Sequence, residues 1–152
     1  MVANQNPWAT LQALEALVLK RGVTLGRMSE RDLLITLAYA SLSIPLLAEQ
    51  SETSANQALK EWLGGGGTML RIDHVELRRS LIDMGYWVRD GFGRAYSRPV
   101  LADDHPAKAH VDAMSSADVS SLLREVRSKR DAERLQRQTK FQDQITAASE
   151  RK

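Results

Sequence analysis

The feature that most constrains the fold is the segment of residues 73–98, DHVELRRSLIDMGYWVRDGFGRAYSR, in which a short helix leads directly into a hairpin. Asp73 and Glu76 have the spacing of a capping box, which predicts a helix that begins at residue 73. Gly85 stands where the left-handed residue of a helix C-terminus is usual, so the helix is predicted over 73–84. The runs YWVR and RAYSR flank the glycine-bearing turn DGFG, which predicts a β-hairpin.

Three further helices are predicted before this segment. The first opens at Asn6-Pro7 and ends at Gly22, because proline suits a first helical turn and glycine a helix end. The second covers about residues 30–43 behind a cap at Ser29, and its nearly continuous apolar sequence predicts the most buried helix.

The third helix is predicted to begin at Ser51 or Thr53 and to stop at the four glycines of residues 64–67, which are expected to form a mobile loop. Helices followed by a hairpin are the order of a winged helix-turn-helix domain. The predicted fold class is therefore mainly α with a small β-hairpin, a winged helix-turn-helix core and flanking N- and C-terminal helices.

Downstream of the hairpin, residues 99–114 are predicted to be a polar linker, and Ser115 or Ser116 is expected to cap a long helix that runs towards Ala148. Its first half carries an apolar stripe, but no heptad repeat is sustained, so a long coiled coil is not supported. The predicted organisation is an N-terminal helical arm (1–25), a winged-helix domain (26–98), the linker (99–114) and the long C-terminal helix (115–152).

Composition and charge narrow the functional classes. The chain has no cysteine, which excludes disulfides, thiolate zinc sites and cysteine catalysis. The absence of a signal-like N-terminus and of an apolar span predicts a cytoplasmic protein without membrane contact. The net charge is only +2, yet residues 71–98 hold six arginines against four acids, and residues 124–140 hold seven basic residues against three acids. Both excesses are of a kind that attracts phosphate, although ordinary solvated helices show them too.

Two adjacent arginines on the predicted helix have different roles. The apolar face, which is expected to pack into the core, holds Leu77, Leu81 and Met84. Arg79 points nearly opposite, towards solvent or a phosphate, unless Glu76 or Asp83 at helical spacing pairs with it. Arg78 lies beside the apolar face, so it is better placed for a structural salt bridge, for example with an acid in the third helix.

The cations of this segment are candidates for contact with DNA. Phosphate contacts need only positive charge within reach, whereas base reading needs defined side chains in a groove. Because the helix has no Asn or Gln to pair with adenine, binding is expected to depend on backbone phosphates, with Arg79 and His74 as the evident base readers. Cations of the hairpin can alternatively protect an exposed edge strand against aggregation. The predicted DNA-binding residues are Arg71, His74, Arg79, Arg89, Arg94 and Arg98, and a structural role is predicted for Asp73, Arg78 and Gly85.

The same segment resembles a known family. The pattern D-x-x-x-L-R-R-x-L-I-D-x-G-x-x-V-R-x-x-x-G-x-x-Y, from Asp73 to Tyr96, is similar to the signature of a bacterial domain family of unknown function. GRM at 26–28 and NQAL at 56–59 resemble weaker parts of that pattern. The resemblance covers about residues 26–98 and implies a winged-helix fold, found alone or fused behind arsenical-resistance-type repressor domains.

Other chemistry finds little support in the sequence. His105 and His110 stand five residues apart in a proline-bearing linker, which favours a solvated segment over a metal site. The GGGGTML run lacks the GK[ST] of a phosphate-binding loop. We therefore expect no metal, no cofactor and no enzymatic activity.

These patterns predict a winged-helix protein that binds double-stranded DNA and regulates transcription. The alternative is an interaction module that keeps the winged fold and binds a protein partner through the C-terminal helix. A homodimer is also predicted, because the apolar stripes of residues 8–20 and 116–126 must cover each other, the domain or a second subunit.

Overall fold

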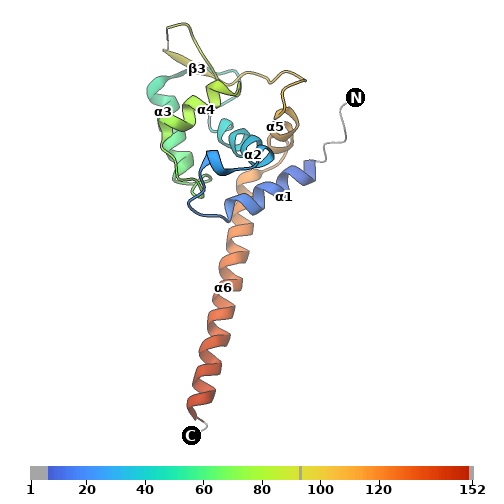
Figure 1. The fold of residues 1–152 in the computed structure, drawn as a ribbon, viewed down its shortest axis with the longest axis vertical. Coiled ribbons are helices and arrows are strands. Elements are labelled where there is room, and N and C mark those ends of the chain that lie inside the picture. The colour runs from blue at the N-terminus through green and yellow to red at the C-terminus, as the bar shows by residue number, and fades with distance from the viewer. Residues whose placement is uncertain (1–6, 93, 151–152) are drawn as a thin grey trace. The chain divides into compact units, whose positions relative to one another are not determined.

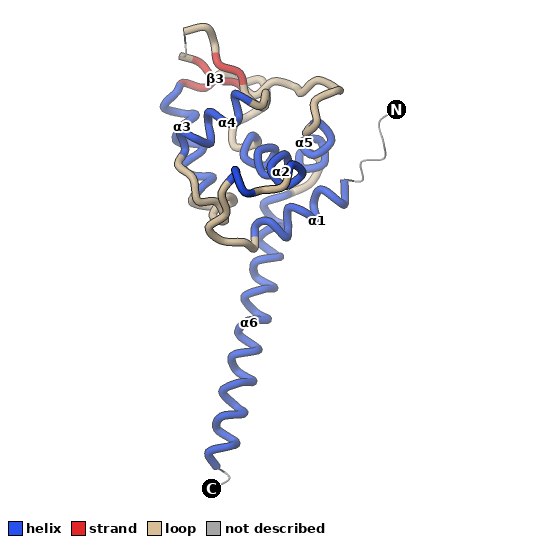
Figure 2. The backbone as a smooth tube through the Cα atoms, viewed as in Figure 1, coloured by secondary structure: helices blue, strands red, loops and turns tan. Residues whose placement is uncertain are grey.

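The computed structural model describes residues 7–92 and 94–150, which are mainly helical with a small antiparallel sheet (Figures 1 and 2). The chain divides into two compact units, one up to Val119 and one from Ser120 onward. In chain order the elements are α1 (Pro7–Val18), η1 (Leu25–Arg27), α2 (Glu30–Ser41), β1 (Gln50–Ser51), α3 (Glu52–Leu63), α4 (His74–Asp83), β2 (Val88–Arg89), β3 (Ala95–Ser97), α5 (Lys108–Ser115) and α6 (Val119–Glu150). The predicted fold class is confirmed.

α2 is the central helix of the first unit. The hydroxyl of Ser29 caps it by accepting a hydrogen bond from the backbone N–H of Asp32 at 3.2 Å. Every residue from Ile35 to Ser41 is buried, and α1, α4 and α5 all contact this helix. The prediction that the second helix is the buried one is confirmed, although the helix ends two residues earlier than expected.

The apolar face of α1 is covered within the chain. Asn6 lies outside the described residues, and the helix begins at Pro7 as predicted. Its buried residues are Thr10, Leu11, Leu14, Leu17 and Val18. The neighbouring helices are α2 and α5. Because the chain itself buries this face, the physical reason for expecting α1 at a dimer interface no longer holds.

The segment after the hairpin differs from the prediction. Residues 99–114 were expected to form a polar linker, but they contain most of α5, which buries Ala113 and Met114. Ser115 is the last residue of α5 and Ser116 is its C-cap, so the two serines that were expected to begin the long helix end α5 instead. α5 is only eight residues long and follows Pro106 and a charged stretch, which is why its pattern resembled a linker.

The sheet has three antiparallel strands in the order β1-β3-β2. Tyr96 of β3 is buried and pairs with Gln50 of β1 on one side and Arg89 of β2 on the other. The hairpin of β2 and β3 confirms the prediction, whereas β1 was missed because two residues cannot show an alternating pattern. The order α2-β1-α3-α4-β2-β3 is consistent with a winged-helix arrangement, and Figure 1 shows the hairpin above α3 and α4.

The four glycines after α3 form a packed turn. Ser51 caps α3 through its hydroxyl, and the helix ends at Leu63, as the glycine run predicts. A Cβ atom on Gly66 would lie 2.1 Å from the Tyr39 hydroxyl oxygen, and one on Gly67 would lie 2.4 Å from the Trp62 ring. These glycines therefore allow close approach to aromatic side chains, a role that the expectation of a mobile loop did not include.

No helix in the described ranges is both long and apolar enough to cross a membrane.

Candidate nucleic-acid interface

Both ends of α4 are fixed by the residues that the sequence predicts. At the start, the Asp73 carboxylate accepts a hydrogen bond from the backbone N–H of Glu76 at 2.8 Å. At the end, Gly85 has a φ of +80°, a conformation that only glycine adopts without strain. The Asp73 cap and the left-handed Gly85 therefore set the two ends of α4.

The apolar face of α4 is shorter than predicted. Leu77 and Leu81 are completely buried, as expected. Met84, predicted to share their face, is 37% exposed. It is the C-cap residue, with φ −97° and ψ 9°, so its backbone has already left the helical path and its side chain has left the helical face.

Two aromatic side chains anchor the end of α4 and the start of the hairpin to α2. The Tyr86 hydroxyl donates to the Leu34 carbonyl at 2.9 Å, and burial raises the pKa of this phenol. The Trp87 indole N–H donates to the Ser41 carbonyl at 3.1 Å. Both residues belong to the run YWVR, which predicts a strand, but they precede β2 and hold the hairpin against the core.

Arg78 is occupied inside the domain. Its guanidinium forms an ion pair with Glu52 of α3, Nη1 to Oε1, at 3.2 Å, and donates a short hydrogen bond to the Asn56 side-chain oxygen. It also lies over the Tyr96 ring, 5.4 Å from its centroid. The Arg78 side chain is only 13% exposed. It therefore links α4 to α3 and β3, and the ion pair joins it to an acid of the third helix.

Arg79 has a different environment. It is exposed, and among the residues that the structure describes it forms no ion pair, neither with Glu76 nor with Asp83. Arg71, just before α4, is also exposed, whereas His74 is half-buried. Arg79 is thus the cation of α4 that is available to an external anion.

The hairpin presents two further exposed arginines. Arg89 lies on β2, and Arg94 lies just before β3 with its guanidinium 6.0 Å from the centroid of the Phe92 ring. Phe92 is 84% exposed at the turn, and it is not among the residues predicted to contact DNA. Its only signal in the sequence is an aromatic residue inside a polar turn.

Arg98, the last predicted DNA-binding residue, is instead tied to the core. Its Nε donates to the Ile44 carbonyl at 3.0 Å, and its own carbonyl accepts from the Leu47 N–H at 2.9 Å. Burial lowers the pKa of this guanidinium. The structure thus gives Arg98 a part in holding the base of the hairpin to the segment after α2, which the sequence did not indicate.

The two histidines of the segment before α6 lie in separate contacts. His105 accepts from the Ala107 N–H at its Nδ1 and bonds to the Met84 carbonyl through its Nε2 at 2.8 Å. His110 bonds to the Thr10 hydroxyl at 2.7 Å. They hold the segment to the end of α4 and to α1, respectively.

The net charge of this part of the chain is small. Residues 27–98 contain nine arginines and lysines and nine aspartates and glutamates, so their net charge is zero. Attraction for an anion must therefore come from the local arrangement of exposed arginines and not from an overall positive field.

Residues 27–98 match a bacterial protein family described as "Uncharacterized protein conserved in bacteria (DUF2087)". The matched segment begins in η1 and ends one residue after β3, so it leaves out α1, α5 and α6. The predicted resemblance to a bacterial family of unknown function is confirmed at this level. No curated protein and no solved structure matches the chain.

Proposed function

We propose that residues 27–98 form a winged-helix domain that binds double-stranded DNA, and that the protein regulates transcription in the bacterial cytoplasm. The observation that carries the proposal is the separation of its arginines into two groups. Arg78 and Arg98 are bonded inside the domain. Arg79, Arg89 and Arg94 are exposed and, within the described ranges, form no ion pair.

In this proposal α4 is the helix that enters the major groove, which is wide enough to admit an α-helix. Arg79 lies on its exposed face and can reach a guanine edge or a phosphate. Arg89 and Arg94 contact phosphates from the hairpin, so they fix the position of the domain without reading sequence. Base reading is then limited, because His74 is half-buried and the face carries acids beside Arg79.

The test is fluorescence anisotropy with a labelled duplex of random sequence, titrated with the full chain at several salt concentrations. Removing two phosphate contacts lowers the slope of log K against log salt by about 1.8. We expect this change for the double variant Arg79→Gln/Arg94→Gln. The matched control is Arg21→Gln/Arg27→Gln, which removes two exposed arginines outside α4 and the hairpin. Equal effects of the two pairs would contradict the proposal.

The alternative function, an interaction module without DNA binding, gains support if the duplex does not bind even at 50 mM salt. A homodimer remains part of the proposal, because a two-fold protein can hold both halves of a palindromic site. Its interface would lie outside the buried face of α1. A monomeric mass in light scattering on the full chain would remove this part.

A further inference from the structure

The positive charge of this protein is concentrated in its second unit. Residues 120–152 carry nine basic and five acidic residues, a net charge of +4, whereas residues 1–119 carry twelve basic and fourteen acidic residues, a net charge of −2. Of this excess, +2 belongs to α6 and +2 to Arg151 and Lys152 at the end of the sequence, whereas residues 27–98 contribute none.

The arginines of α6 form a stripe. At 3.6 residues per turn, the four arginines at 127, 130, 134 and 137 fall within an arc of about 80°. None of the aspartates and glutamates at 125, 131, 133 and 143 falls in this arc. We call this face, from Arg127 to Arg137, the arginine stripe. It is about 15 Å long, because each helical residue adds 1.5 Å.

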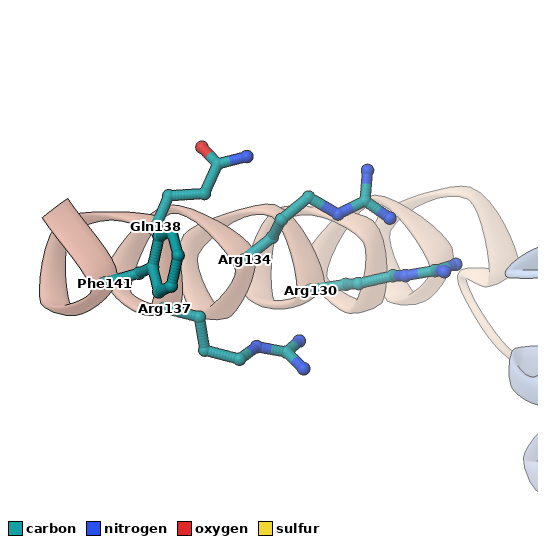
Figure 3. Close-up of a pocket in the computed structure, with 5 residues that line it drawn as sticks. All are labelled: Arg130, Arg134, Arg137, Gln138 and Phe141. Carbon is teal, nitrogen blue, oxygen red and sulfur yellow. The ribbon is translucent and has the colours of Figure 1, made fainter. Parts of the chain in front are cut away.

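Figure 3 shows three of the four arginines of the stripe, with their neighbours Gln138 and Phe141. Arg130, Arg134 and Arg137 extend from one helix, with their guanidinium groups on the N-terminal side of the Phe141 ring. Together these five residues line an open surface pocket of about 440 Å³. A pocket whose walls come from one helix surface cannot enclose a small molecule, so an extended ligand suits it better.

Two of these arginines are particularly available. Arg134 and Arg137 are exposed, and neither forms an ion pair among the residues that the structure describes. The Nε of Arg137 makes a long hydrogen bond, 3.4 Å, to the Glu133 carbonyl, which leaves the end of its guanidinium for another partner.

We propose that the arginine stripe of α6 binds the phosphate backbone of double-stranded DNA. Duplex DNA carries about one negative charge per 1.7 Å of its axis, so every arginine along a 15 Å stripe has phosphates within reach. A helix about 10–12 Å in diameter fits the major groove, and guanidinium groups bind phosphate oxygens in a bidentate manner. This surface goes beyond the proposed function, because it lies on a different element from α4 and the hairpin.

Other occupants fit the stripe less well. Pairing with the stripe of a second copy would place arginines against arginines, which is unfavourable. The centre of a protein–protein interface is typically apolar, although arginine is enriched there, whereas the arginine stripe itself holds no apolar residue and the exposed Phe141 and Ile145 lie beyond its end. Single-stranded nucleic acid binds to arrays of aromatic side chains, but Phe141 is the one aromatic residue of α6.

The experiment uses the full chain, a labelled random-sequence duplex and anisotropy titrations between 50 and 300 mM salt. The variant Arg134→Gln/Arg137→Gln removes two charges from the stripe, and Lys129→Gln/Lys140→Gln removes two exposed charges from another face of the same helix. Glutamine has a good helix propensity, so circular dichroism is expected to show unchanged helicity for both. Because each lost phosphate contact changes the slope by about 0.9, the first pair is expected to weaken binding about 10-fold or more at 0.1 M salt and to lower the slope by about 1.8. The second pair is expected to change the affinity less than 3-fold.

Equal weakening by the two pairs overturns the stripe, since it would show a diffuse charge effect. No weakening by the stripe pair overturns it as well. A change in mass of the stripe variant by light scattering assigns the face to a second copy. Unlabelled poly-glutamate that competes as well as duplex DNA at equal charge concentration assigns it to an acidic polypeptide.

The two proposals fail independently. If Arg134→Gln/Arg137→Gln weakens binding and Arg79→Gln/Arg94→Gln does not, α6 binds DNA and the function proposed for residues 27–98 is wrong. The opposite pattern retains that function and removes the stripe.

Discussion

Replacing Arg78 with alanine should destabilise the first unit although the residue is a charged arginine on a short surface helix. The change removes the charged donor to Asn56, the ion pair with Glu52 and the contact with the Tyr96 ring. The neighbouring Arg79→Ala is the control, because Arg79 is exposed and has no ion pair in the described part of the chain.

The magnitude follows from the three contacts of Arg78. A hydrogen bond from a charged group to a partly buried partner contributes about 1.5–3 kcal/mol. The ion pair adds at most about 1 kcal/mol, because the Glu52 side chain is 53% exposed and solvent screens the charge. The contact with the ring adds about 0.5–1 kcal/mol. Since one side chain makes all three contacts, they are not additive, and we expect a loss of about 2–4 kcal/mol in the free energy of unfolding.

Urea unfolding of the full chain, followed by tryptophan fluorescence, measures this loss, because Trp62 and Trp87 are buried in the same unit. For a domain of this size, a loss of about 2–4 kcal/mol lowers the melting temperature by about 8–15 °C. Arg79→Ala is expected to stay within about 0.5 kcal/mol of the wild type. Arg78→Lys keeps the charge but not the guanidinium fork, so its stability should lie between them. If Arg78→Ala and Arg79→Ala unfold at the same urea concentration, the structural role of Arg78 is wrong.

Two further predictions concern the end of α4 and the contact between α5 and α1. Gly85→Val is expected to lower the unfolding free energy by about 1–3 kcal/mol, because a β-branched residue is strained at a φ of +80°. The control is Gly91→Val, because a Cβ atom added at Gly91 meets nothing within 4 Å. Equal melting temperatures of the two variants would contradict a left-handed Gly85 at the end of α4. Burial, and secondarily the charge of Arg31, lowers the pKa of His110, so the unfolded chain takes up this proton first as the pH falls below about 6.5. The free energy of unfolding that the His110–Thr10 contact contributes should therefore be complete above that pH and decrease below it. Urea unfolding at pH 7.5 and 5.5 is expected to show a smaller change in unfolding free energy between the two pH values for His110→Gln than for the wild type.

The helix boundaries that the sequence predicted well are those set by local chemistry. Ser29, Ser51 and Asp73 each accept a hydrogen bond from a backbone N–H three residues later, and Gly85 has the left-handed conformation that its position indicates. A cap satisfies backbone groups of its own helix, so its signal lies within a few residues of sequence.

The features that the sequence did not indicate depend on contacts between distant segments. Arg98 bonds to the Ile44 carbonyl, 54 residues earlier, and no local pattern distinguishes it from the exposed Arg94. The same is true of Gly66 and Gly67, whose roles are set by the rings of Tyr39 and Trp62. β1 exists only because β3 lies beside it. The exposure of Arg79 was therefore predictable from the helical wheel, whereas no local pattern separated the bonded Arg98 from the exposed Arg89 and Arg94.

If the chain binds DNA as proposed, the division of charge separates long-range attraction from contact at close range. The segment 27–98 has no net charge, so it contributes little long-range attraction, and contacts such as that of Arg79 would act mainly at close range. The second unit, with a net charge of +4, attracts a polyanion at longer range, and its arginines bind any phosphate. If both proposals hold, α6 supplies most of the salt-dependent affinity and α4 supplies the discrimination. Loss of the stripe would then weaken binding to all sequences by a similar factor, whereas loss of Arg79 would reduce the difference between sequences, because only a groove contact depends on base identity.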